Sequence, residues 1–459
     1  MRKNLLLLAL FGGIFFSAAS AISYPDATFK EFPTPEVMNE TGGTQVLGIS
    51  RNGRFIYGGT YVAGGFVYDV KLDTMYMASA TGVSDDGWTA GTLRSTNLLT
   101  GENRYLEGVS GYGFIMSTSI SGDGAIITGC GGPNWTELEP LYWENGKVHI
   151  LPYPTTAQVG DFKVNGCRAQ GVSADGSIIY GYFIANPNTY PLIVWERQED
   201  GTYEYIDTWS ELYEPLHQWV YDYDSKTYDF VRGDKPYCWF EPMAMSADGK
   251  LIVIRTQINT EDPAPPTQVG YYHTDTRTFE LAPFSEDNLI FKEGNCIINQ
   301  VSNDGTAAGI TQMLNLSDGI PFLMPYMGEP QFLNDIFPQF DRLDYYQDSK
   351  DYKGGLPYLC TSISADGRFI AGYSTDVITY YRGFDSTEDL GFWGYVIDTD
   401  PSAGWPENNE GSGVETIAAE EGDEGPEEYY TLQGLRVLNP DHGIYIVRSA
   451  SGKTRKVVI

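Results

Sequence analysis

One short pattern returns seven times along the chain and constrains the fold more than any other feature. An apolar residue precedes Ser, any residue, Asp or Asn, and Gly, as in GISRNG at Gly48 and SISADG at Ser362. Successive serines lie 34 to 73 residues apart, which suits a repeated four-stranded unit with loops of variable length. The serines are Ser50, Ser84, Ser121, Ser173, Ser246, Ser302 and Ser364.

Each copy predicts a tight turn between two antiparallel strands. Asp-Gly and Asn-Gly tolerate the positive φ of such turns, and the serine hydroxyl can bond the local backbone. The residues after the turn are apolar and β-prone, as in a buried strand. Calcium binding by the aspartates is the alternative, but each turn offers one carboxylate where calcium takes several oxygen ligands. We therefore interpret these turns as structural.

A second hairpin follows most copies, as in PLYWENGKVHIL after Pro140 and VGYYHTDTRTFEL after Val269. Two hairpins supply four strands, which is the content of one propeller blade. The sequence thus predicts an all-β fold, a seven-bladed β-propeller over residues 22–400. Trp143, Trp195 and Trp393 fall on predicted third strands, and we expect them in the core.

The I-S-x-D-G turn and the later W-x-x-G hairpin together resemble the HAF-type extracellular repeats and, more loosely, WD-like propeller repeats. The resemblance covers roughly Thr28 to Asp398 and lacks the Trp-Asp pair of WD repeats. It implies a propeller fold and an extracellular location. It implies no active site, because unrelated functions share this fold.

The last repeat supplies only three strands, the third at Phe392–Asp398, before the chain becomes acidic. The N-terminal segment ATFKEFPTP parallels the fourth-strand segments KVHILPYP and RTFELAPF. We therefore predict that Thr28–Phe32 completes the last blade and removes an exposed sheet edge. Phe29 is expected to pack inward and Phe32 to lie at the end of the strand.

Segments outside the propeller are predicted at both ends. Residues 1–21 combine Arg2 and Lys3, an apolar run and an Ala-Ser-Ala site, which is typical of a signal peptide. The alternative is a membrane anchor, but the apolar run is shorter than a bilayer span. Residues 401–428 hold nine acidic residues and no Lys or Arg, which indicates a solvated linker.

Residues 429–459 predict a small β-module of three strands. Through its L-Q-G-L-R-V, G-I-Y-I-V and K-V-V-I elements it resembles the C-terminal sorting domains of type IX secretion in Bacteroidetes. That resemblance implies contact with secretion machinery, and the alternative is an appended module without a targeting role. We expect an exported protein, secreted or at the cell surface with the periplasm as an alternative, and no transmembrane segment in the mature chain.

The net charge bears on which partners the chain can bind, and the number of cysteines bears on disulfides and metal ligands. The formal net charge of −32 repels the phosphates of nucleic acid, so we expect no nucleic-acid partner. Five cysteines cannot all pair within one chain, and we interpret them as small buried residues rather than disulfides or metal ligands. They are Cys130, Cys167, Cys238, Cys296 and Cys360.

Long insertions mark one face of the predicted propeller. The tight turns within each blade lie on one face, whereas the insertions fall in connections on the other, where a rigid scaffold presents binding loops. The insertions are Gly131–Glu139, Ala185–Tyr190, Thr208–Tyr237, Thr256–Thr267, Asn334–Pro357 and Thr375–Leu390.

Aromatic residues in these insertions are the candidate ligand contacts. Their rings can stack on sugars or peptides while neighbouring carboxylates accept hydrogen bonds, and local packing of the rings is the alternative. The candidates are Trp135, Trp209, Trp219, Tyr221, Tyr223, Tyr345, Tyr346, Tyr380 and Tyr381.

Catalytic patterns are sparse. The chain has four histidines and lacks a nucleophile elbow, an H-E-x-x-H motif and a phosphate loop. We assign no catalytic residue, no metal ligand and no cofactor. The expected function is the binding of a glycan or protein ligand through the long-loop face. The alternatives are a carboxylate-dependent polysaccharide hydrolase or lyase on that face and a structural or adhesive envelope protein.

Overall fold

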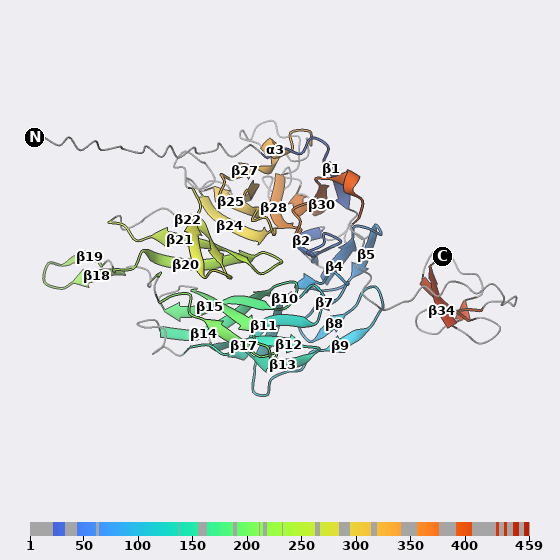
Figure 1. Ribbon diagram of the computed structural model, residues 1–459, viewed down its shortest axis with the longest axis horizontal. Helices are drawn as coiled ribbons and strands as arrows, with labels where there is room; N and C mark the ends of the chain where they lie inside the picture. The colour runs from blue at the N-terminus through green and yellow to red at the C-terminus, as the bar shows by residue number, and fades with distance from the viewer. Residues whose placement is uncertain are drawn as a thin grey trace, which may run out of the picture. The chain divides into compact units, whose positions relative to one another are not determined.

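The computed structural model shows an all-β chain that divides into two compact units, Met1–Gly404 and Trp405–Ile459 (Figure 1). Each unit is described by itself. The described residues are 22–32, 44–60, 64–135, 137–154, 163–186, 191–210, 212–213, 218–231, 233–261, 267–283, 294–313, 319–340, 356–375, 392–405, 428–430, 436–437, 444–448 and 454–458.

Six four-stranded antiparallel sheets form the regular blades of the first unit, a β-propeller. We number the blades by the repeat that begins each of them. Blade 1 contains β2 (Thr44–Ile49), β3 (Phe55–Thr60), β4 (Gly64–Asp69) and β5 (Thr74–Met77); blade 3 contains β10 (Phe114–Ile120), β11 (Ile126–Asn134), β12 (Glu137–Glu144) and β13 (Lys147–Ile150); blade 4 contains β14 (Lys163–Val172), β15 (Ile178–Asn186), β16 (Leu192–Arg197) and β17 (Tyr203–Ile206).

The other regular blades follow the same order of strands. Blade 5 contains β20 (Tyr237–Met245), β21 (Leu251–Ile258), β22 (Thr267–His273) and β23 (Thr278–Leu281); blade 6 contains β24 (Gly294–Val301), β25 (Ala307–Met313), β26 (Gly319–Met324) and β27 (Gln331–Phe332); blade 7 contains β28 (Leu356–Ile363), β29 (Phe369–Thr375), β30 (Phe392–Asp398) and β1 (Thr28–Phe32). The short helix α3 (Leu333–Ile336) follows β27, and a 3-10 turn, η4 (Pro401–Ala403), follows β30.

The second repeat forms two short sheets instead of one regular blade. β6 (Gly82–Val83) pairs with β7 (Thr89–Ala90), and β8 (Arg94–Thr96) pairs with β9 (Asn103–Tyr105). One bridge between Trp88 and Asn97 joins the two sheets. The predicted propeller is therefore confirmed with six regular blades, and the second repeat departs from the predicted four-stranded unit.

Every repeat serine sits in the predicted turn and is buried. In blade 4 the Ser173 hydroxyl donates to the Asp175 carboxylate at 2.6 Å and accepts from the Ile178 amide at 3.0 Å. Gly176 completes the turn with a φ of 73°, a conformation that favours glycine. The same carboxylate accepts from the amide of Ser177 at 2.9 Å. Because the aspartate bonds its own turn in this way, its role is structural.

The seven turns are hydrogen-bonded to one another in a closed circuit around one end of the propeller. Five links join the backbone N–H of one turn to the carbonyl of the next at 2.6–2.9 Å. In the other two links a side chain accepts. The Asn52 amide donates to the Asp85 carboxylate at 2.8 Å, and the Asp248 amide donates to the Asn303 side-chain oxygen at 3.0 Å. The circuit includes the turn at Ser84.

The N-terminal strand completes blade 7, as predicted. β1 runs antiparallel to β30, with Thr28 opposite Asp398 and Phe32 opposite Gly394. Lys30 reaches blade 1, where its ammonium lies 2.9 Å from the Asp73 carboxylate. Residues from the two ends of the propeller sequence therefore share one sheet, which removes an exposed edge.

Phe32 ends β1 and Phe29 packs against a core cluster, as predicted, but Phe32 is also deeply buried, which was not predicted. Phe32 is only 2% exposed and stacks on Tyr68 of blade 1, with ring centroids 4.7 Å apart. Phe29 is only partly buried and stacks on Tyr395. The two residues are three positions apart, so they point to opposite faces of the strand. Both faces of β1 are therefore packed, and Phe32 is the core residue at the junction with blade 1.

Core residues otherwise follow the sequence analysis. Trp143 and Trp195 are buried, whereas the side chain of Trp393 lies outside the described residues. Four cysteines are buried free thiols, which confirms their interpretation as small buried residues; they are Cys130, Cys167, Cys238 and Cys296. The side chain of Cys360 lies outside the described residues. Over the described ranges, no helix has the length and apolar character that a membrane span requires.

Two further β elements accompany the propeller. Between blades 4 and 5, β18 (Gln218–Asp222) and β19 (Thr227–Val231) form a hairpin that projects from the rim (Figure 1). The second unit contains one four-stranded sheet of order β32-β31-β33-β34. Its strands are β31 (Glu428–Tyr430), β32 (Arg436–Val437), β33 (Ile444–Arg448) and β34 (Thr454–Val458), one more than the three predicted.

Candidate functional site

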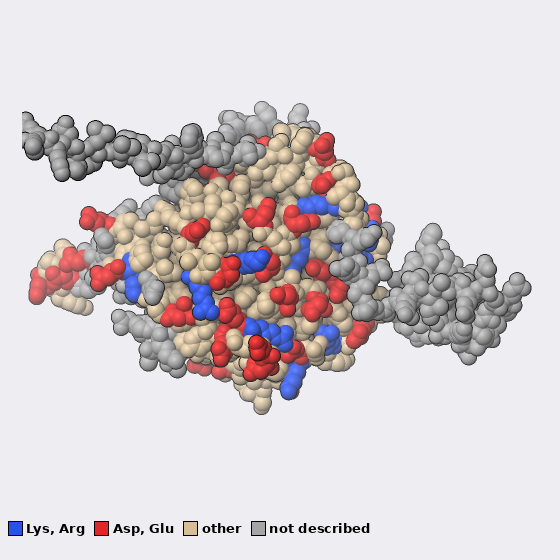
Figure 2. Space-filling view, in the orientation of Figure 1, with Lys and Arg blue, Asp and Glu red and all other residues tan. Residues whose placement is uncertain are grey.

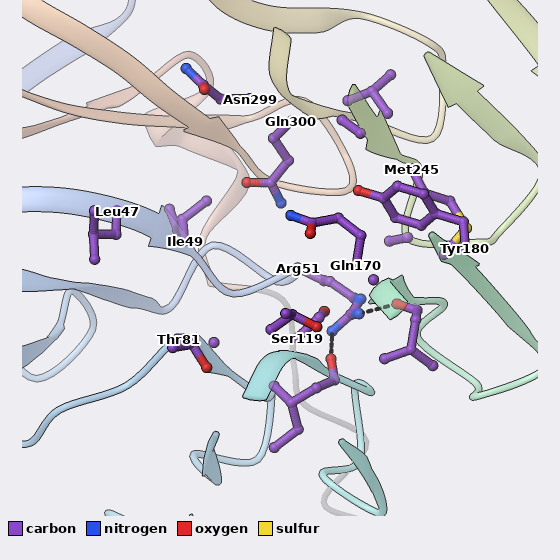
Figure 3. A pocket seen from close by; sticks show the side chains of 18 of the residues that line it. Leu47, Ile49, Arg51, Thr81, Ser119, Gln170, Tyr180, Met245, Asn299 and Gln300 are labelled. Carbon is purple, nitrogen blue, oxygen red and sulfur yellow. Dashed lines mark hydrogen bonds between the residues drawn. The ribbon is translucent and has the colours of Figure 1, made fainter. Parts of the chain in front are cut away.

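A cavity of about 480 Å³ lies between the inner strands of the propeller (Figure 3). All seven repeats contribute described lining residues, mostly from the first strand or the serine turn, while Tyr57 and Tyr180 come from the second strands β3 and β15. Most of these residues stand within a few positions before a repeat serine. The cavity therefore sits on the axis of the ring, next to the circuit of turns. Its volume is in the range of small-molecule sites in proteins.

The cavity wall is polar and positively charged. Arg51 and Arg168 line it, and no Asp or Glu occurs among its described lining residues, although the chain carries a formal net charge of −32. Hydroxyl and amide side chains supply the other polar groups, and they are Tyr57, Thr81, Thr118, Ser119, Gln170, Tyr180, Asn299 and Gln300. Such a wall offers hydrogen bonds in both directions together with a cationic field.

Arg51 closes the turn end of the cavity. It follows the first repeat serine, and its guanidinium donates to the carbonyl oxygens of Ile120 at 2.6 Å and Val172 at 2.5 Å (Figure 3). These carbonyls end β10 and β14, so the side chain joins three blades. Burial lowers the pKa of the Arg51 guanidinium from its ordinary value, while nearby carboxylates, Asp85 foremost, act in the opposite direction. An arginine stays charged under such a shift.

Arg168 and Gln170 carry polar atoms that lack a protein partner. Both residues lie on β14 and line the cavity. The Arg168 Nε and the Gln170 Oε1 are buried, and neither atom has a hydrogen-bond partner within the described part of the chain. A buried donor or acceptor without a partner costs about 1–3 kcal/mol, so native proteins seldom keep one without a reason. Side by side, they present one cationic donor and one neutral acceptor.

The outer surface has a different character. On the face shown in Figure 2, acidic and basic side chains intermingle, and acidic ones gather on the β18–β19 hairpin. Asp222, Asp224 and Asp229 belong to this hairpin. The cavity wall is thus a local region of positive charge in an acidic chain. Its electric field attracts anions into the cavity.

The structure separates the predicted ligand contacts instead of gathering them. Trp135 follows β11, is 69% exposed and stacks on Phe114. Tyr223 is 84% exposed in the β18–β19 turn. Trp219 and Tyr221 lie on β18, but their side chains are outside the described residues. Four further candidates lie outside the described residues, and they are Tyr345, Tyr346, Tyr380 and Tyr381.

Trp209 does not present its ring to solvent, which corrects the sequence-based expectation for this residue. It is 5% exposed and packs edge-on against Phe183, with ring centroids 5.2 Å apart. The reason is tertiary: the chain folds back after β17, so this part of the insertion covers the core of blade 4. Among the described candidates, Trp135 and Tyr223 remain available at the surface.

Sequence reasoning missed the residues of the cavity. Arg168 and Gln170 stand five and three positions before Ser173, and Gln300 stands two positions before Ser302. Comparing the repeats with one another gives the signal that could have identified these residues. The turn positions repeat, whereas the positions before the serine change from Leu and Ile in one repeat to Gln, Asn or Arg in another.

Comparisons with solved structures return other proteins at low sequence identity. An oligogalacturonate lyase from Vibrio parahaemolyticus aligns with a TM-score of 0.46 and 9% identity, over 83% of this chain and 98% of that chain. An oligogalacturonate lyase in complex with manganese aligns with a TM-score of 0.46 and 12% identity, over 83% and 97%. TolB from Acinetobacter baumannii aligns with a TM-score of 0.32 and 12% identity, over 65% of each chain.

These likenesses concern the propeller fold alone. No family model matches the chain, and no curated protein sequence matches it. The resemblances to HAF-type repeats and to type IX sorting domains therefore have no family match behind them.

Proposed function

We propose that the chain is an exported binding protein whose axial cavity holds an anionic, hydroxyl-bearing ligand, namely an acidic sugar residue of a glycan. The observation that carries the proposal is the pair of unpartnered buried atoms on β14, Arg168 Nε and Gln170 Oε1. A sugar acid satisfies both, because its carboxylate accepts from the guanidinium and its hydroxyls donate to the amide oxygen.

The cavity favours a saccharide over a protein ligand. Its volume of about 480 Å³ accommodates a small molecule or the end of a chain. A stable protein partner would need about 800 Å² of contact on each side, which an axial cavity does not provide. The surrounding amides and hydroxyls, Gln300 and Ser119 among them, match the many hydroxyl groups of a sugar.

The ligand enters from the end of the ring opposite the serine turns. The turn end is closed by the hydrogen-bonded circuit and by Arg51, which spans the gap between blade 1 and blades 3 and 4. The opposite end carries the connections into which the long insertions fall. This direction of entry joins the cavity to the long-loop face on which ligand binding was predicted.

We also propose that residues 82–105 act as a reduced blade and complete a ring of seven. Their serine turn belongs to the circuit, since Asp85 donates to Gly122 at 2.9 Å and accepts from Asn52 at 2.8 Å. Thr81, directly before this segment, hydrogen-bonds Ser117 of blade 3 at 2.8 Å. The axial cavity thus has seven walls, of which the second is short.

Export is part of this proposal and rests on the pattern of residues 1–21. The four-stranded sheet of residues 428–458 fits a small appended module, and we propose that it serves delivery to the cell surface. Recovery of a chain that begins near Ile22 from outside the cytoplasm of the producing cell supports this part. Recovery only from the cytoplasm contradicts it.

Binding is tested by calorimetric titration of the purified chain with glucuronate and galacturonate, against glucose and galactose. We expect the acids to bind and the neutral sugars to bind at least about ten-fold more weakly, because a charge-assisted hydrogen bond contributes about 1.5–3 kcal/mol. Arg168→Met, which keeps the length of the side chain, should lose that preference, whereas Arg168→Lys should keep part of it. The affinity for the acids should also fall with added salt.

The matched control is Arg94→Met, which removes an exposed cation on β8. It changes the net charge as Arg168→Met does but leaves the cavity unchanged. Equal affinities for acids and neutral sugars would overturn the proposal. So would an equal loss in both arginine variants, because binding would then report the overall charge and not the cavity.

A further inference from the structure

An aromatic pair, half-buried Phe114 and exposed Trp135, lies at the end of blade 3 opposite its serine turn. Phe114 begins β10, and Trp135 follows β11. Their ring centroids lie 3.9 Å apart and their planes are inclined by 20°, so the rings are stacked. Trp135 is 69% exposed. One face of the indole therefore rests on Phe114 while much of the ring contacts solvent.

Polar contacts hold the chain around this pair. The Glu137 amide donates to Asn134 Oδ1 at 3.1 Å, and Asn134 Nδ2 donates to Glu137 Oε2 at 3.2 Å. The Tyr112 hydroxyl donates to the Glu139 carboxylate. Asn134 and Glu137, on either side of Trp135 in the chain, are thus hydrogen-bonded to each other, which limits the conformational entropy lost when a ligand packs on the ring.

Isolated exposed aromatic residues are ordinary, so exposure alone assigns nothing. Tyr105 and Tyr223 are more exposed than Trp135. Trp135 differs because a second ring fixes its plane and because an amide and a carboxylate flank it within the same loop. A flat apolar ring edged by hydrogen-bonding groups matches a pyranose, whose faces carry C–H groups and whose rim carries hydroxyls.

The pair and the cavity share one strand and one interface between blades. β10 begins at Phe114, and Thr118, Ser119 and Ile120 at its other end line the cavity. Four residues of extended strand place Phe114 roughly 13 Å from Thr118. On the neighbouring blade, the Ala169 carbonyl, next to Arg168 in the chain, accepts a hydrogen bond from the Thr118 hydroxyl at 2.9 Å. Arg168 therefore belongs to the part of β14 that adjoins the cavity end of β10.

We propose that the Phe114–Trp135 pair is a second saccharide subsite, which stacks a pyranose of the same glycan whose acidic residue occupies the axial cavity. This inference rests on the proposed function and deepens it, because it makes the ligand an oligosaccharide. The pyranose packs on the indole face, and Asn134 and Glu137 bond its hydroxyls. A protein partner is disfavoured because one ring and its edge offer far less area than a stable protein interface needs.

The test is calorimetric titration of the whole chain with glucuronate and with acidic di-, tri- and tetrasaccharides that contain it. We expect affinity to rise with chain length in the natural protein. Trp135→Ala should weaken tetrasaccharide binding by about 3- to 10-fold, as expected for one lost stacking contact, and should leave glucuronate binding unchanged. Trp135→Phe should restore most of the loss. Tetrasaccharide should also protect Trp135 from fluorescence quenching by iodide, which glucuronate should not do.

Tyr105→Ala is the matched control, because Tyr105 is 77% exposed on β9 and lies outside the proposed subsite. Binding of glucuronate tests the cavity alone, so its failure overturns the proposed function and leaves the aromatic pair to be judged by neutral oligosaccharides. Unchanged tetrasaccharide affinity in Trp135→Ala overturns the subsite. An equal loss for glucuronate and tetrasaccharide also overturns it, because the ring would then act on the fold.

Discussion

The turn end of the propeller and the wall of its cavity are built from the same seven repeats, but their sequences differ in how far they are shared between repeats. At the turns, Ser and Gly recur in every repeat, and in all seven the Gly amide donates to the Ser carbonyl, as Gly176 does to Ser173 at 3.1 Å. A few positions earlier the repeats diverge: the position of Gln170 is occupied by Leu, Thr, Met or Asn in the other repeats. The positions that all repeats share form the turns and close the ring. The positions that differ between repeats determine which polar groups line the axial cavity.

Shared and divergent positions meet different physical requirements. A residue that every repeat shares satisfies a need that every blade has, which is a closed turn and a link to the next blade. A polar or charged residue that appears in one repeat only is not required by the blade. Arg168 illustrates this, since no other repeat has a cation at its position and its buried Nε has no hydrogen-bond partner in the described chain. Stability and binding should therefore respond to different substitutions.

The largest effect is expected where the ring itself closes. Phe32 is 2% exposed, stacks on Tyr68 and lies directly against Gly394. Phe32→Ala should lower the free energy of unfolding by about 3–5 kcal/mol, because it removes a buried ring and leaves a cavity at the junction of blades 7 and 1. Urea denaturation followed by circular dichroism measures this.

Phe29→Ala is the matched control on the same strand. Phe29 is only partly buried against Tyr395, so its replacement should cost less than half as much. Equal effects of the two substitutions would mean that β1 contributes through its hydrogen bonds to β30 and not through packing on blade 1. The assignment of Phe32 as the core residue of the junction would then be lost.

Two substitutions in blade 4 test this difference, one at a turn position and one in the cavity wall. Ser173→Ala leaves the Ile178 amide without its acceptor and should cost about 1–3 kcal/mol of stability, without a selective effect on ligand affinity. Gln170→Ala removes a buried acceptor that has no protein partner, so stability should change by less than about 1 kcal/mol. Glucuronate affinity should fall in this second variant. Denaturation and titration of both proteins would separate the two roles, and the reverse pattern would refute the comparison.

The sequence predicted the turns, the order of strands and the closing strand, because these features depend on local chemistry. Ser-x-Asp-Gly has few conformations available, and Thr28–Phe32 could be placed because the last repeat lacked a fourth strand. The cavity could not be predicted in the same way. Arg51 reaches Ile120 and Val172, which lie 69 and 121 positions away, so its role depends on the register of three separate blades.

Trp209 and the second repeat show the same limit. A tryptophan in a long insertion is a reasonable ligand contact, but whether its ring faces outward depends on Phe183, which belongs to another strand. The second repeat has the serine turn of a full blade, yet its sheets contain strands of only two or three residues. Motifs identify where a blade begins, whereas strand length follows from packing against neighbouring blades.

The smallest expected effect concerns pH and two aspartates with opposite shifts. At the junction of blades 7 and 1, hydrogen bonds from Tyr68 and Lys30 lower the pKa of the Asp73 carboxyl from its ordinary value of 3.8. Its contribution to stability is therefore present above that value and is lost as the pH falls through the lowered pKa. In the turn circuit, burial raises the pKa of the Asp85 carboxyl, and the hydrogen bond from the Asn52 amide opposes this.

The contribution of Asp85 to stability depends on pH in the opposite direction, because ionisation of its carboxyl is less favourable in the folded chain than in the unfolded one. Its contribution is present below 3.8 and is lost as the pH rises through the raised pKa. Asp73→Asn should therefore be less stable than the natural protein at neutral pH and converge with it in acid. Asp85→Asn, which keeps the acceptor for Asn52, should converge in acid and be relatively more stable at neutral pH.

Because Asp73 is largely exposed, solvent screening should keep its effect below about 1 kcal/mol. Urea denaturation from about pH 3 to about pH 7 measures both differences. Shifts of the same sign in the two variants would show that the turn circuit is no more desolvated than the junction.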